Sequence, residues 1–430
     1  MASNIHGFPF ARIEFKKNGA IHIPDEVRAV AEMCKTLELS DLLVVSHGWN
    51  NNVTEATELY EALAGSMRTL LDSGVAPKIP RHKTGFLGVF WPSKKFTPEE
   101  LQPGGGASLA GAEHLDALLV QEIGALGEFS SHPEASTLVR EALDALQRVE
   151  ERADAERFRS SILKLLDEPG GQLTEELPSE MTELRASDLF DRLSGIILID
   201  DLTPVAGGGA GGVTSIRVGV QRFLNLLTYF KMKKRAGVVG ERGMVELLHS
   251  VKREAPSTRL HLVGHSFGGR LVAAAASALG SRNVSIVETV TLLQAAFSHN
   301  GFAQNYRDNH DGYFRPAITK HGVRRRIAVT HTHNDKANKL AYPLATRLHR
   351  VDGAALGDED DRFGAIGANG ALHTPEAVSL SMPLAHHRHG APPDKLVLNF
   401  NADDCIRDHG DVSNQHVANL VLLTVEDGIL

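Results

Sequence analysis

The fold is decided by the stretch Leu260-His-Leu-Val-Gly-His-Ser-Phe-Gly268 and by the alanine-rich segment that follows it. The first four residues form a short apolar run typical of a buried strand, and Phe267–Leu279 favours a helix packed closely on a sheet. Between strand and helix lies a G-x-S-x-G pattern, whose glycines let the chain turn tightly and lift the serine hydroxyl clear of the sheet. We therefore predict that Ser266 is a nucleophile on a strand-to-helix turn; an ordinary glycine turn is the alternative.

Strand-like apolar runs alternate with helical segments through much of the remaining chain. This alternation predicts an α/β protein with a doubly wound, mainly parallel sheet and right-handed crossovers. We expect strands at 41–46, 86–91, 289–293, 326–330 and 396–401, and helices at 54–71 and 241–254. Near the start, the turn Lys16-Lys-Asn-Gly19 separates residues 12–15 from residues 20–23 and predicts a short opening hairpin.

Glycine-rich stretches and helical segments replace the strand pattern between residues 93 and 215. We therefore expect residues 1–92 and 216–430 to form the two parts of one α/β core, and residues 93–215 to form a helical cap inserted into it. The expected cap helices lie at 110–126, 134–150, 154–167 and 180–194. Glycines at both ends, in Gly104–Gly106 and Gly207–Gly212, would let the cap act as a lid over Ser266.

The composition of the 430 residues narrows the class of protein. Hydrophobic residues make up 42% and charged residues 23%, which are ordinary values for a globular chain. The formal charge of -8 lacks the basic excess that binding to nucleic acid needs. Cys34 and Cys405 are the only cysteines and no apolar signal segment is evident at the start, so we expect a cytoplasmic protein.

One segment raises the question of contact with a membrane surface. Val218–Arg235 combines aromatic and apolar residues with a basic end, as an interfacial membrane helix does. A core-facing helix with a solvated basic end is the preferred interpretation, because basic residues suit the negative end of the helix dipole. No apolar run in the sequence reaches the roughly 18 residues that a membrane-spanning helix needs.

Four motifs together carry a resemblance to a known superfamily. They are Ser46-His-Gly-Trp-Asn-Asn51, Phe90-Trp-Pro-Ser93, Gly264-His-Ser-Phe-Gly268 and Asp335-Lys-Ala337. With them the chain resembles the α/β-hydrolase superfamily over most of its length, and more narrowly a group of bacterial hydrolases with an H-G-[FYW]-N-N loop. The resemblance implies the α/β-hydrolase fold and a serine hydrolase that uses no cofactor.

The resemblance also implies roles for individual residues. In the superfamily an H-G pair after the third strand provides one oxyanion donor, which maps to the backbone N–H near Gly48 or Trp49. The second donor is the N–H of Phe267, directly after the nucleophile. The acid maps to Asp335, after a late strand, although an aspartate there is also a favoured helix N-cap.

The catalytic base is expected after the last strand, where two histidines compete. His409 lies in the turn-forming sequence Asp408-His-Gly-Asp411 and is preferred. His416 is the alternative base, but it precedes apolar residues with helical spacing.

Metal chemistry is a competing interpretation of three clusters. Imidazole and carboxylate groups at His331, His333 and Asp335, or in His386-His-Arg-His389, suit zinc or iron. Neither cluster has the spacing of an H-E-x-x-H or paired-cysteine motif, so we expect no metal. Asp358-Glu-Asp-Asp361 suits calcium, but an acidic surface loop is the preferred interpretation.

The sequence therefore predicts a serine hydrolase that cleaves a carboxylic ester through an acyl-enzyme on Ser266. A small-molecule, lipid or aryl ester is the expected substrate. The alternative is a catalytically silent hydrolase fold that serves as a binding or scaffolding module, because folds of this kind host many functions.

Overall fold

The computed structural model describes residues 3–93, 112–130, 132–166, 177, 180–194, 215–306, 309–338, 364–388, 390, 392 and 394–429. The chain divides into two compact units. The first unit holds Met1–Lys94, Arg235–Pro343 and Ala354–Leu430, and the second holds Lys95–Lys234 and Leu344–Gly353. The α/β elements belong to the first unit.

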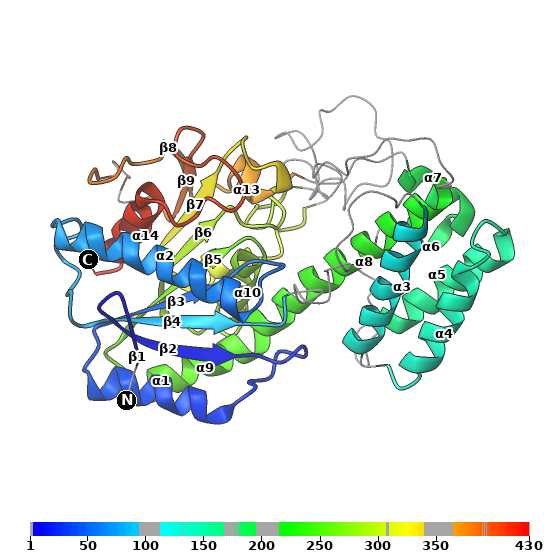
Figure 1. Ribbon diagram of the computed structural model, residues 1–430. Coiled ribbons are helices and arrows are strands. Elements are labelled where there is room, and N and C mark those ends of the chain that lie inside the picture. Colours follow the sequence, from blue (N-terminus) through cyan, green and yellow to red (C-terminus); the bar gives the residue numbers. More distant parts are fainter. Residues whose placement is uncertain are drawn as a thin grey trace. The chain divides into compact units, whose positions relative to one another are not determined.

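One mainly parallel sheet organises the first unit (Figure 1). Among the described residues its strands are β1 (Ser3–Ile5), β2 (Phe8–Glu14), β3 (Asp41–Ser46), β4 (Thr84–Phe90), β5 (Arg259–His265), β6 (Val287–Leu293), β7 (Val323–His331), β8 (Ala377–Ser381) and β9 (Val397–Asn401). Their order is β1-β2-β4-β3-β5-β6-β7-β9-β8, and only the β1–β2 pair is antiparallel. Every residue of β3, β4 and β6 is buried, as expected for parallel strands covered on both faces. The predicted α/β class with a mainly parallel sheet is confirmed.

Helices cover both faces of this sheet. In the first unit they are α1 (Pro24–Thr36), α2 (Val53–Asp72), π-helical η3 (Gly240–Met244), α9 (Val245–Glu254), α10 (Phe267–Ser281), α11 (Pro316–Thr319), α13 (Ile366–Asn369) and α14 (Gln415–Asp427). Helix α2 packs against α14 over one face, and α1 packs against α9 over the other (Figure 1). Tyr60, Met67 and Leu420 of α2 and α14 are buried together with Phe86 and Phe400 of the sheet. This shared apolar layer holds the two helices on one face of the sheet.

The predicted opening hairpin is confirmed only in part. Strand β2 takes its antiparallel partner from the residues before it, with Ile5 opposite Phe8. The expected second strand makes a single antiparallel bridge, from Phe15 to Ile21. Helix α1 begins at Pro24, so too few residues follow the turn to form a longer ladder.

The second unit contains the helices α3 (Ala112–Phe129), α4 (Ala135–Leu146), α5 (Arg152–Leu166), α6 (Glu180–Glu183) and α7 (Ala186–Ser194). Phe158, Phe190 and Phe223 pack edge to face in its core, with ring centroids 6.0 and 5.3 Å apart. Helical segments were expected here up to residue 215, and the main segment of the unit runs on to Lys234. Gly104–Gly106 and Gly207–Gly212 lie outside the described residues, and the role of this unit as a lid stays a prediction.

Helix α8 (Ser215–Val239) contains the segment considered for membrane contact. Its basic end differs from the expectation of a solvated cluster, because Arg235 is buried and donates from Nη1 to the carbonyl of Pro92 at 2.7 Å. In the part of the chain that the structure describes, no helix combines the length and apolar character needed to cross a membrane.

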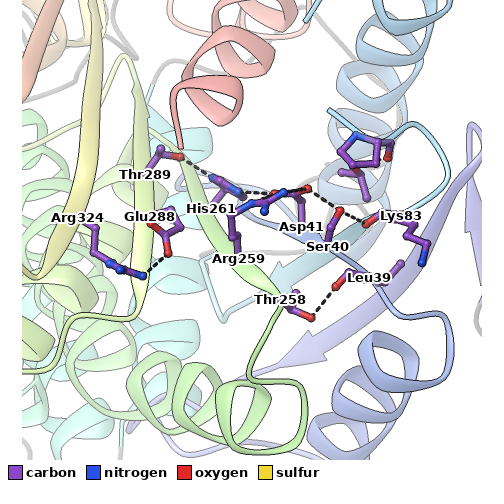
Figure 2. Close-up of polar contacts among 12 residues, drawn as sticks. Leu39, Ser40, Asp41, Lys83, Thr258, Arg259, His261, Glu288, Thr289 and Arg324 are labelled. Atoms are coloured by element: carbon purple, nitrogen blue, oxygen red, sulfur yellow. Dashed lines mark hydrogen bonds and ion pairs between the residues drawn. The ribbon is translucent and has the colours of Figure 1, made fainter. Parts of the chain in front are cut away.

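A buried polar network lies at the amino ends of the central strands (Figure 2). Asp41, fully buried at the start of β3, accepts two hydrogen bonds from Arg259, of 2.7 and 2.8 Å. It also accepts from Ser40 Oγ at 2.7 Å and lies 3.1 Å from Nε2 of His261. Nδ1 of His261 in turn lies 2.8 Å from the hydroxyl of Thr289. The network therefore ties β3 to β5 and β6 at the edge of the sheet opposite Ser266.

Candidate active site

The loops that follow five parallel strands meet at the carboxyl edge of the sheet. Strand register aligns Ser46 of β3 with Gly264 of β5, and His265 with Leu293 of β6. The ends of β7 and β9 are aligned in the same way. In open parallel sheets, ligand sites form outside this edge. The register therefore brings the predicted site residues together, although they are far apart in the sequence.

Ser266 lies on a strained turn between β5 and α10. It is the N-cap of α10 with φ 56° and ψ -123°, a conformation that non-glycine residues rarely adopt. A Cβ on Gly264 would lie 2.4 Å from the carbonyl oxygen of Gly268. A Cβ on Gly268 would lie 2.4 Å from the carbonyl oxygens of Ser46 and His47. The turn therefore has no room for a side chain at either glycine, because its own backbone is too close to Gly264 and the end of β3 is too close to Gly268.

Ser266, His409 and Asp335 form one chain of hydrogen bonds. Nε2 of His409 lies 2.9 Å from Oγ of Ser266, and Nδ1 lies 2.8 Å from Oδ2 of Asp335. A carboxylate only accepts, so Nδ1 carries the proton and Nε2 is free to accept the serine proton. Asp335 is fully buried, and it also accepts from the backbone N–H of Asn338 at 2.9 Å and from its Nδ2 at 2.8 Å.

The charges of this chain support one another. Burial disfavours the carboxylate of Asp335, but the nearby His409 and the Asn338 donors lower its pKa below the ordinary value. Burial likewise disfavours the imidazolium of His409, but Asp335 raises its pKa above the ordinary value. The arrangement thus stabilises a proton on His409 while Asp335 stays ionised.

The loop after β3 contacts the nucleophile. A Cβ on Gly48 would lie 2.8 Å from the Cβ of Ser266, so this backbone passes directly beside the serine. His47 Nδ1 lies 2.9 Å from the carbonyl oxygen of Gly48, while the indole N–H of Trp91 donates to the carbonyl of His47 at 3.0 Å. The rings of Trp49 and Phe267 lie 6.0 Å apart. The three expected oxyanion residues, Gly48, Trp49 and Phe267, are therefore close to Ser266, and their role as donors stays a prediction.

His416 lies in the first turn of α14 and takes part in a different contact. Its Nδ1 accepts from the backbone N–H of Ala385 at 2.9 Å. Asn414 caps this helix by accepting from the N–H groups of His416 and Val417. The structure thus places His409, and not His416, beside Ser266.

The clusters considered for metal binding have other partners. Asp335 pairs with His409, and His333 Nδ1 lies 3.0 Å from Oδ2 of Asp403. His386 Nδ1 lies 3.2 Å from the hydroxyl of Ser73. His389 and the acidic stretch 358–361 lie outside the described residues. Within the described ranges, no group of three or more histidine, cysteine or acidic side chains has the arrangement to hold a metal ion.

Several polar residues around the site were not predicted. His265 donates from Nε2 to the carbonyl of His409 at 2.8 Å, and burial lowers its pKa to about 3, so it is neutral. Asp403 accepts from the hydroxyl of Thr332 at 2.8 Å and so joins the loops after β9 and β7. Gln294 also contacts the loop after β9, and the signal for it in the sequence was a polar residue directly after the apolar run of β6.

No protein-family model matches the chain, and neither the curated proteins nor the solved structures contain a match.

Proposed function

We propose that this protein is a serine hydrolase that cleaves a carboxylic ester through an acyl-enzyme on Ser266. The observation that carries the proposal is the hydrogen-bonded chain from Ser266 through His409 to buried Asp335. Support also comes from the strained conformation of Ser266, because such strain is concentrated at functional sites. The sheet is compatible with the α/β-hydrolase fold, which we propose for the first unit.

The proposed reaction begins when Oγ of Ser266 attacks the ester carbonyl and its proton moves to Nε2 of His409. Asp335 keeps its charge and stabilises the imidazolium that forms. The backbone N–H groups at Gly48 or Trp49 and at Phe267 are the proposed donors to the oxyanion, each worth about 100- to 1000-fold in rate. His409 then protonates the departing alcohol. A water molecule gives a proton to the same imidazole and attacks the acyl-enzyme, and the imidazole passes this proton to Oγ of Ser266 as the carboxylic acid leaves.

The proposed substrate is a lipid or aryl ester, and the proposed residues need no cofactor or metal. We also propose a cytoplasmic location, which is supported by the small number of cysteines; both Cys34 and Cys405 are free thiols.

Covalent labelling tests the proposal most directly. The wild-type protein should react with a fluorophosphonate probe and hydrolyse short p-nitrophenyl esters, whereas Ser266→Ala should do neither, because the attacking oxygen is missing. Ser277→Ala is a matched control, since Ser277 lies on α10 and both serines are 6% exposed.

The control should keep both labelling and ester hydrolysis. Labelling that persists in Ser266→Ala would overturn the assignment of the nucleophile. A folded wild-type protein that neither reacts nor hydrolyses esters would instead favour the silent binding module.

A further inference from the structure

Gln294 is a strained and fully buried polar residue at the end of β6. It is the first residue after this strand, and its side chain is fully buried. Its φ of 39° lies in the left-handed region, which residues other than glycine rarely adopt. Its backbone N–H donates to the hydroxyl of Thr330 at 3.0 Å. Strain of this kind persists only where the surrounding contacts hold the residue in place.

The side chain of Gln294 holds the loop of the proposed base. Its Nε2 donates to the carbonyl oxygen of Asp408 at 3.0 Å and to that of His409 at 3.4 Å. This loop follows β9, which is not a neighbour of β6 in the sheet, so the contact joins the end of β6 to a loop from a more distant strand.

The backbone of Gln294 holds the proposed acid through one intermediate. Its carbonyl oxygen accepts from Nδ2 of Asn338 at 2.7 Å. The same Nδ2 group donates to Oδ2 of Asp335 at 2.8 Å, the oxygen that also faces His409. Gln294 therefore contacts the loop that carries His409 and also contacts Asn338, which binds Asp335. The proposed acid and base lie in separate loops, and Gln294 is joined to both.

We infer that Gln294 is a positioning residue that sets the distance between Asp335 and His409, an inference that rests on the proposed serine hydrolase function. It touches no reacting atom and acts through the loop of His409 and through Asn338. A displacement of about 1 Å in a site of this kind costs roughly 100-fold in rate, so two loops need such a shared anchor.

The test compares Gln294→Met with Asn419→Leu. Each variant keeps the approximate shape of a buried amide and removes the donor. Asn419 is a matched control because its Nδ2 also donates to two loop carbonyls, those of Leu384 and His387, each at 2.8 Å. Both variants should lower the melting temperature by similar amounts.

For Gln294→Met we expect kcat for a p-nitrophenyl ester to fall roughly 10- to 100-fold, with KM changed less than about twofold. The midpoint of its pH–rate profile should move down, because the contact between Asp335 and His409 is loosened. Asn419→Leu should keep kcat within about twofold and leave the profile unchanged. Equal kcat values in the two variants, or an unchanged profile in Gln294→Met, would overturn the inference.

A second readout separates this inference from the proposed function. If the wild-type protein shows no hydrolysis and no labelling, the proposed function fails, and the positioning role is judged by proton NMR of the Nδ1–H of His409. That downfield signal should be present in the wild type and in Asn419→Leu, and absent in Gln294→Met. A signal retained in Gln294→Met would overturn the positioning role, whatever the activity.

Discussion

At the scale of single residues, the pKa of His409 is decided by two opposed influences. Burial alone would lower it, but the carboxylate of Asp335 in direct contact, with a smaller effect from Asp408, raises it. The imidazole is 28% exposed, so solvent reaches it. Its Nε2 also lies 2.9 Å from Oγ of Ser266. The same carboxylate that holds the ring also decides at which pH the ring is neutral.

We predict that kcat/KM rises with pH with a midpoint above the ordinary histidine value of about 6.5, because only neutral imidazole accepts the serine proton. In Asp335→Asn the midpoint should fall and turnover should decrease by roughly 10,000-fold, since the charge and the tautomer control are both lost. The measurement is a pH–rate profile of ester hydrolysis for each protein.

Asp408→Asn is the matched control for this profile. Its carboxylate accepts from the backbone N–H of Gly410 at 2.8 Å, and its effect on the pKa of His409 is the weaker one. Turnover should stay within about tenfold and the midpoint should move less than in Asp335→Asn. Equal shifts in the two variants would contradict the proposed role of Asp335.

At the scale of elements, the loop after β9 and the helix after it give two histidines different roles. His409 lies in the loop and reaches Ser266, whereas His416 lies in the first turn of α14 and accepts from Ala385. A loop residue is free to approach the serine because its backbone is not held in a helical ladder. The start of α14 at Gln415, capped by Asn414, thus separates the two candidates.

We predict that His409→Ala lowers kcat at least about 1000-fold, which is the scale of losing a member of a Ser-His-Asp set. His416→Ala should change kcat by less than about tenfold, because it removes only a contact with the 385 loop. Steady-state kinetics of both variants, each with its melting temperature, is the measurement. The reverse ranking would transfer the role of the base to His416.

At the scale of the whole molecule, the two edges of the sheet carry different polar groups. The carboxyl edge holds Ser266 and its partners, and the amino edge holds the Asp41 network (Figure 2). Burial disfavours the charge on Asp41, but His261 and Arg259 outweigh it and lower the pKa of this carboxyl. Its folded-state pKa lies below the unfolded value, so its contribution to stability is present above pH ~4 and is lost as pH falls further.

We therefore predict that Asp41→Asn lowers the free energy of unfolding by about 3 kcal/mol at pH 7, because it breaks a buried ion pair. The difference from the wild type should shrink below pH ~4, as Asp41 itself becomes protonated. Asp25→Asn is the control, since its ion pair with Arg28 is exposed and should contribute less than about 1 kcal/mol. Urea unfolding at several pH values is the measurement, and a difference that does not change with pH would contradict this account.

The sequence by itself determined the features that depend on neighbouring residues. The apolar run 41–46 coincides with β3, and the start predicted for the helix after Ser266 coincides with that of α10. The tight turn at Gly264 and Gly268 was also readable, because a G-x-S-x-G pattern is a local steric requirement. The short strand β8 and the helix α1 were not predicted.

Only the tertiary structure decided which distant residues meet. The sequence favoured His409 over His416 only through its place in a turn-forming sequence, and the polar residue at position 294 did not show that Gln294 lies against the loop of residue 409. Strand order and register bring together groups that are more than a hundred residues apart in the sequence. The burial of Arg235 and the Asp41–His261 contact were hidden for the same reason. Local patterns specify helices, strands and turns, whereas the partners of a buried polar group depend on how all the strands assemble.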